Sequence, residues 1–98
     1  MGMELILVPS VQKTLKGLVK VDRRRFERVR IALDKLAVDP RDPTLSNHPV
    51  RGAGALTPWG AKQWIAYVET STPAAWRMVW SYGPSEGEIT VTWIGPHY

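Results

Sequence analysis

The sequence predicts an α+β sandwich in which two helices pack on one face of a single sheet. Two observations lead to this prediction. The first half holds a short apolar run and two segments with apolar residues every three to four positions, as in amphipathic helices. The last third holds three strand-like segments, and two of them alternate apolar and polar residues, as in half-buried strands. We therefore expect the order β-α-α-β-β-β and an antiparallel-rich, four-stranded sheet.

The N-terminal half supplies the first strand and both helices. Residues 3–8 form an apolar run of the kind that lies buried in a sheet. Amphipathic spacing predicts a helix at about 11–20. Asp22 is the expected N-cap of a second helix, whose apolar stripe spans residues 26–37. Two short helices joined this tightly make a helical hairpin.

The segment from residue 38 to 60 differs in composition, because it is dense in Pro and Gly. No regular element is expected within it. Long loops in compact domains often carry function. His48 and Arg51 lie in this loop, and Lys62 follows it.

Three strands are expected after the loop, at residues 64–70, 76–82 and 88–94. In the second of them, every other residue from Trp76 is apolar and large, so Arg77 has the opposite parity and faces away from the apolar row. The expected apolar row of the last strand consists of Ile89, Val91 and Trp93. With turn residues between the strands, they form a meander to which the first strand is added.

Composition narrows the functional classes. Ninety-eight residues suit one domain, spanning 1–98. The chain has no Cys, and its two His lack metal-ligand spacing, so we expect no disulfide and no metal. No apolar run is long enough for a membrane span, and a reducing cytoplasm is the expected location. The net charge of +4 points to an anionic partner, either nucleic acid or an acidic protein.

The C-terminal quarter carries a family resemblance. The strand from Trp76 to Trp80, the strand after it and the terminal His97-Tyr98 resemble the end of the RelE/ParE superfamily of bacterial toxins. The resemblance is closest to its YoeB-like branch, whose chains end in His-Tyr. It implies a RelE-like sandwich whose bare sheet face is an RNA cleft. It also implies a toxin of a type II toxin–antitoxin system that cleaves messenger RNA on the ribosome by 2′-hydroxyl attack, without a cofactor.

The resemblance assigns roles to three residues at this end of the chain. Metal-independent RNA cleavage needs a base, a cation for the developing charge and an acid for the leaving oxygen. Arg77 matches the catalytic arginine of the family, and the alternative is a structural salt bridge to Glu69 or Glu88. His97 and Tyr98 match the proton donor and the base-stacking ring, and the alternative is a frayed terminus.

The identity of the general base is left open by the sequence. His48 stands near the position where YoeB-like toxins carry a carboxylate, so the residue type has changed. A neutral imidazole can accept the proton, whereas the alternative is an exposed loop histidine. Glu69 is the second candidate for the general base.

Arg51 and Lys62 match basic loop positions that hold RNA phosphates in the family.

Two further groups of residues are considered for contacts to RNA. The arginines at 23–25, with Arg28 and Arg30, form either a solvated helix face or a contact to ribosomal RNA. Trp59 and Trp64 are the tryptophans expected to stack on a base, and the remaining ones are expected mostly in the core.

The implied partners are messenger RNA on the ribosome and an acidic antitoxin with a segment that folds over the cleft. The sequence does not fix the oligomeric state, and a homodimer is compatible with it.

Two other functional classes stay open. One is a ParE-like toxin that inhibits DNA gyrase without nuclease chemistry, against which the terminal His97-Tyr98 argues. The other is a degenerate RelE-fold binding module, which the change to His48 keeps open.

Overall fold

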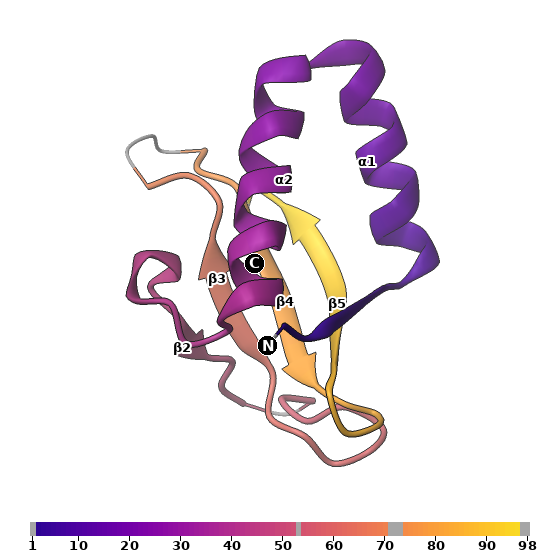
Figure 1. The fold of residues 1–98 in the computed structure, drawn as a ribbon, viewed down its shortest axis with the longest axis vertical. Coiled ribbons are helices and arrows are strands. Elements are labelled where there is room, and N and C mark those ends of the chain that lie inside the picture. Colours follow the sequence, from indigo (N-terminus) through magenta and orange to yellow (C-terminus); the bar gives the residue numbers. More distant parts are fainter. Residues whose placement is uncertain (1, 53, 71–73, 97–98) are drawn as a thin grey trace.

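The computed structural model of the chain describes residues 2–52, 54–70 and 74–96. The elements are β1 (Glu4–Leu7), α1 (Pro9–Val21), α2 (Arg23–Val38), a short 3₁₀ helix (Pro43–Leu45), β2 (His48–Pro49), β3 (Trp64–Tyr67), β4 (Arg77–Tyr82) and β5 (Glu88–Gly95) (Figure 1). The predicted order of helices and principal strands is confirmed. Within the described residues, neither α-helix has the length and apolar character needed to cross a membrane.

The strands form one mixed sheet in the order β1-β5-β4-β3-β2. β1 runs parallel to β5, and the other neighbours are antiparallel. The α+β prediction is confirmed, but the sheet has five strands rather than four. The additional strand, β2, lies within the segment that was expected to have no regular element. Its Pro49 sits at the edge of the sheet, where a missing backbone N–H breaks no ladder bond.

Both helix starts follow from local capping. α1 begins at Pro9 rather than at position 11, because proline is well suited to the first helical position, where its missing N–H is not needed. α2 begins after Asp22, whose carboxylate accepts a 3.1 Å hydrogen bond from the backbone N–H of Arg25. The predicted N-cap is therefore confirmed.

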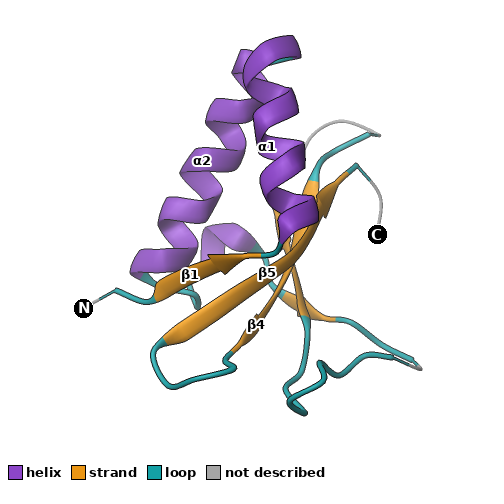
Figure 2. Cartoon of the chain, turned by 90° about the vertical axis from the view of Figure 1, so that its right-hand side faces the viewer, coloured by secondary structure: helices purple, strands orange, loops and turns teal. Residues whose placement is uncertain are grey.

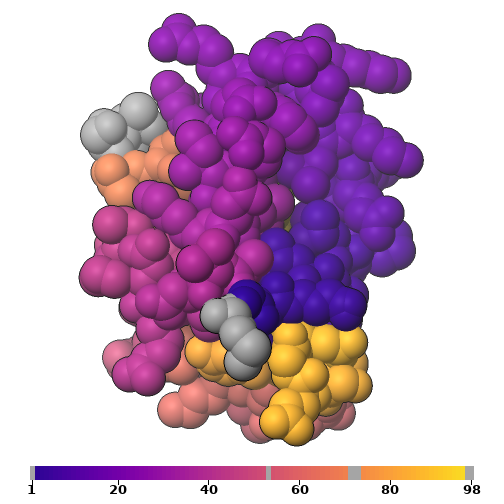
Figure 3. Space-filling model, viewed as in Figure 1, coloured from indigo at the N-terminus to yellow at the C-terminus, as the bar shows by residue number. Residues whose placement is uncertain are grey.

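Both helices cover one face of the sheet, as Figure 2 shows, and from that side they hide most of it (Figure 3). The helical layer and the sheet both contribute side chains to the core between them. The helices and the 3₁₀ helix supply Val11, Leu18, Val29, Leu33, Leu36 and Leu45, and the sheet supplies Ala66, Met78, Trp80, Ile89, Val91 and Ile94. Because both helices pack on this side, the opposite face of the sheet has no helix over it.

A β-bulge changes the side-chain pattern of β5. Adjacent residues of β4 pair with Trp93 and Val91, so Thr92 is an extra residue in β5. Beyond a bulge, the alternation of side chains between the two faces is reversed. The prediction that Trp93 belongs to the core row is therefore wrong. Ile94 takes that place in the core, and Trp93 faces the side without helices.

Candidate functional site

The face of the sheet that lies opposite the helices (Figure 2) carries the candidate site. Strand register places on it His48, Ile65, Tyr67, Arg77, Val79, Ser81, Thr90 and Trp93, which we call the open face. Val79 and Ser81 at its centre are fully buried, so larger side chains around them enclose the middle of this face. The predicted position of Arg77 away from the apolar row is confirmed.

Arg77 is the first residue of β4 and pairs with Tyr67 on β3 and with Gly95 on β5. It is half-buried. The central guanidinium carbon lies 5.0 Å from the centroid of the Tyr67 ring, a distance typical of a cation–π contact. Its Nε atom is buried and has no hydrogen-bond partner among the described residues. The ring therefore holds the cation without neutralising its charge.

Neither salt bridge considered for Arg77 forms, because both carboxylates have other partners. Glu88 accepts a 2.9 Å hydrogen bond from the backbone N–H of Ser85 in the β4–β5 turn. Glu69 accepts hydrogen bonds from Arg25 Nε at 3.1 Å, from Arg28 at 3.0 Å and from the backbone N–H of Trp76 at 3.1 Å. Within the described part of the chain, no carboxylate competes for the Arg77 guanidinium.

This network argues against Glu69 as the general base. Its side chain is buried and joins α2 to the end of β3. Burial alone would raise the pKa of Glu69, but hydrogen bonds from Arg25, Trp76 and Arg28 offset this effect and lower the pKa below its ordinary value. A carboxylate with this many donors is a poor proton acceptor and serves to fasten a helix to the sheet.

The arginine cluster of α2 is partly structural. Arg25 and Arg28 bind Glu69, and Arg30 binds Glu27 and Asp34 on its own helix at 3.0 and 2.8 Å. Arg23 and Arg24 at the start of the helix are exposed, and for them a contact to RNA stays a prediction.

His48 lies on the open face beside Tyr67. The two rings meet edge to face, with centroids 5.7 Å apart. The imidazole is exposed, and Nδ1 lies 3.4 Å from the carbonyl oxygen of Ser46. The structure thus brings two predicted site residues, His48 and Arg77, into one row with Tyr67 between them. Sequence reasoning missed Tyr67, because its role depends on the register between three strands.

The predicted phosphate-binding residues lie just beyond the ends of β2 and β3. Arg51 and Lys62 are both exposed on the connection between β2 and β3. The backbone N–H of Val50 donates to the carbonyl of Gln63 at 2.9 Å, so the two halves of the connection leave the sheet side by side. At about 3.3 Å per residue, Lys62 is roughly 17 Å of chain from Tyr67.

The two tryptophans expected to stack on a base do not join the row of His48, Tyr67 and Arg77. Each contacts another part of the protein instead. Trp64 pairs with Trp80 on the helix side of the sheet, and their rings stack with centroids 6.2 Å apart. Trp64 therefore lies on the other side of the sheet from the open face, and its stacking on a base stays a prediction. Trp59 is 38% exposed, and its indole N–H donates to the carbonyl oxygen of Tyr82 at 2.7 Å.

His97 and Tyr98 lie outside the described residues, so their predicted roles stay predictions. β5 ends at Gly95, opposite Arg77, and Pro96 is exposed. In the described part of the chain, no three His, Asp or Glu side chains gather closely enough to hold a metal ion. Among the described residues, the open face thus offers the guanidinium of Arg77 and the imidazole of His48 for the proposed chemistry.

Comparison with known proteins adds the fold relationship. The sequence matches no family model and no curated protein. The structure is similar to a YoeB/ParE toxin from Agrobacterium tumefaciens, with a TM-score of 0.70 and 19% identity, over 98% of this chain and 100% of the other. The chain has the RelE/YoeB toxin fold.

Two further structures share this RelE/YoeB toxin fold. An archaeal RelE–RelB complex from Pyrococcus horikoshii OT3 matches with a TM-score of 0.67 and 18% identity, over 98% of this chain and 96% of that one. A YoeB dimer from Staphylococcus aureus matches with a TM-score of 0.67 and 11% identity, over 98% of both chains. The likeness spans nearly the whole chain, and the fold expected from the C-terminal resemblance is confirmed.

Proposed function

We propose that this chain is the toxin of a toxin–antitoxin pair and that it cleaves messenger RNA on the ribosome. The observation that supports this most directly is the guanidinium of Arg77, which lies half-buried on the open face and has no ion pair within the described residues. A guanidinium is well suited to bind a phosphate with two parallel hydrogen bonds. A phosphate on the open face would pair with this charge.

The proposed reaction is an internal displacement at phosphorus. The 2′-oxygen loses its proton to a base and bonds to the adjacent phosphorus, while the bond from phosphorus to the 5′-oxygen breaks. The products are a 2′,3′-cyclic phosphate and a 5′-hydroxyl. Arg77 stabilises the charge on the phosphoryl oxygens. His48 is the proposed base, because its imidazole is exposed on the same face.

The C-terminal pair completes the proposed site. His97 protonates the leaving 5′-oxygen and Tyr98 stacks on a neighbouring base. This assignment is supported by the position of Gly95, because β5 delivers the chain to the strand position opposite Arg77. Arg51 and Lys62 hold phosphates farther along the RNA by charge.

We also propose an acidic antitoxin as the protein partner. The net charge of +4 favours an acidic segment, and one structural neighbour is a RelE–RelB complex. Another is a YoeB dimer, so a homodimer is a second proposed assembly. The site of action would be the cytoplasm, where ribosomes are. Co-expression with a short acidic protein from an adjacent reading frame should relieve growth arrest, and no relief and no complex would contradict this partner.

A binding role without cleavage is the second candidate. It is favoured by His48, since YoeB-like toxins carry a carboxylate near this position. A ParE-like variant of this role would inhibit DNA gyrase.

One experiment separates these functions. The purified protein is incubated with ribosomes programmed with messenger RNA, and new 5′ ends are mapped, with ribosome-free messenger RNA as control. New 5′-hydroxyl ends that need the ribosome support the proposal. An intact message would overturn it, and a parallel supercoiling assay with gyrase then tests the ParE-like alternative.

A further inference from the structure

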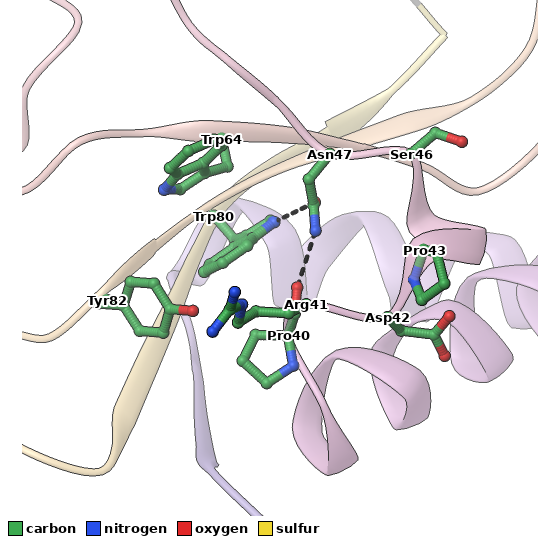
Figure 4. Close-up of a pocket in the computed structure, with 9 residues that line it drawn as sticks. All are labelled: Pro40, Arg41, Asp42, Pro43, Ser46, Asn47, Trp64, Trp80 and Tyr82. Carbon is green, nitrogen blue, oxygen red and sulfur yellow. Dashed lines mark hydrogen bonds between the residues drawn. The ribbon is translucent and has the colours of Figure 1, made fainter.

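A cavity of about 400 Å³ lies between the loop after α2 and the sheet (Figure 4). We call it the aromatic pocket and define it by Pro40, Arg41, Asn47, Trp64, Trp80 and Tyr82. The three aromatic residues belong to β3 and β4 and have the opposite parity to Tyr67 and Arg77. The pocket therefore opens on the other side of the sheet from the open face.

The walls of the aromatic pocket are held in place by mutual contacts. Trp80 stacks on Trp64 and meets the ring of Tyr82 edge to face, with centroids 5.0 Å apart. The indole N–H of Trp80 donates to Asn47 Oδ1 at 2.9 Å, and the amide of Asn47 donates to the carbonyl oxygen of Pro40 at 2.7 Å (Figure 4). A ligand would find the pocket already formed, which reduces the entropic cost of binding.

A cation, Arg41, lies at the mouth of the pocket. Arg41 is exposed, and Figure 4 shows its guanidinium directed toward Tyr82. Among the described residues, its side chain has no ion pair. The neighbouring carboxylates have other partners, because Asp39 accepts the backbone N–H of Arg41 and Asp42 accepts two hydrogen bonds from Thr44. An anion beside the pocket could therefore pair with Arg41.

We propose that the aromatic pocket anchors a large apolar side chain, preferably an aromatic one, from a protein partner that carries an acidic residue next to it. Preformed pockets that enclose an aromatic anchor beside an arginine are typical of the energetic centres of protein interfaces. The rings of Trp64 and Tyr82 bind the anchor, and Arg41 binds the carboxylate.

Two features favour a protein over RNA as the occupant. Asp39 and Asp42 flank Arg41, so their negative charges oppose a phosphate chain. The amide of Asn47 and the indole N–H of Trp80 are already hydrogen-bonded, and so they are not free to read the edge of a base. Because the pocket and the open face lie on opposite sides of the sheet, this inference does not depend on nuclease activity.

The test uses the full chain labelled with ¹⁵N and follows the indole signals of its tryptophans by NMR. The probes are acetyl-Phe-Glu-amide, acetyl-Phe-Lys-amide and adenosine monophosphate. We expect the first probe to bind in the millimolar range and to shift the signals of Trp64 and Trp80 but not that of Trp93 on the open face. Replacing Glu by Lys in the probe should weaken binding about two- to fivefold.

Two variants locate the interaction. Arg41→Gln should remove the difference between the Glu and Lys probes, whereas the exposed Arg24→Gln should keep it. Tyr82→Ala should weaken binding of the Glu probe roughly tenfold, and circular dichroism checks that each variant is folded. The proposal is overturned if the two peptides bind equally to the wild type, if no pocket signal shifts, or if adenosine monophosphate binds there as tightly as the Glu probe.

Discussion

The guanidinium of Arg77 lies over the ring of Tyr67, with its central carbon 5.0 Å from the ring centroid. This contact orients the cation toward the open face and leaves its charge available, because a ring quadrupole attracts a cation without neutralising it. The same ring and the His48 imidazole meet edge to face, with centroids 5.7 Å apart. Tyr67 is therefore placed to position both groups of the proposed reaction.

Tyr67→Ala should lower the single-turnover rate of ribosome-bound messenger cleavage roughly tenfold, the value of a cation–π contact of about 1.4 kcal/mol. Tyr67→Phe keeps the ring and should keep most of the rate. Equal losses in the two variants would assign the effect to the hydroxyl instead and would contradict the positioning role.

The Glu69 network should make the stability of the fold sensitive to acid. The pKa of Glu69 is lower in the folded protein than its ordinary value of 4.5, so the folded state favours the ionised form. This stabilisation is fully present above about pH 4.5 and is lost as the pH falls through the folded-state pKa. Urea unfolding at a series of pH values should show the free energy of unfolding falling across this window.

Glu69→Gln should flatten this pH dependence and lower the free energy of unfolding near neutral pH by about 1–3 kcal/mol. Glu86→Gln is the matched control, because Glu86 is exposed in the β4–β5 turn. Cleavage by the folded Glu69→Gln protein should persist. If cleavage disappears while the protein stays folded, the purely structural role of Glu69 is wrong.

Gly95 is packed against a ring. A Cβ atom at this position would lie 2.6 Å from the Trp93 indole, which is closer than van der Waals contact allows. Gly95→Ala should therefore lower the free energy of unfolding by about 1–3 kcal/mol. In the control Gly17→Ala, the new methyl group meets nothing within 4 Å and should stabilise α1 by about 0.5–1 kcal/mol. Thermal unfolding compares the two, and a neutral Gly95→Ala would contradict the packing described.

Removing His97 and Tyr98 should abolish cleavage with little change in the melting temperature. The reason is that the ladder of β5 ends at Gly95, so the hydrogen-bonded part of the strand is kept. Separate His97→Ala and Tyr98→Ala variants should divide the loss between proton donation and stacking. A truncated protein that cleaves at the wild-type rate would remove the tail from the proposed site.

Local patterns in the sequence were enough to predict the helical layer and the sheet of the fold. Periodicity located both helices and the strands β4 and β5, an apolar run located β1, and Asp22 marked the start of α2. The bulge at Thr92 could not be predicted, because Val91 and Trp93 have the spacing of an uninterrupted row. β2 was missed for a related reason, since a two-residue edge strand leaves no pattern of its own.

In the candidate site, too, the features set by local sequence were predictable, and those set by contacts between distant residues were not. The parity of β4 was sufficient to place Arg77 on the open face. The partners of Glu69 were not predictable, because Arg25 lies 44 residues away in the chain and only the docking of α2 brings the two together. The contact of Tyr67 with Arg77 likewise depends on strand register, which single-strand patterns do not contain.

The rate of ribosome-bound messenger cleavage by Arg77→Ala tests the central claim most directly. The account predicts a loss of about a hundred- to a thousandfold, because the guanidinium stabilises charge that develops in the transition state. The melting temperature should stay near that of the wild type, and Lys16→Ala, which removes one exposed charge from α1, should cleave normally. An Arg77→Ala protein that cleaves at the wild-type rate would contradict the assignment of Arg77 and, with it, the nuclease site on the open face.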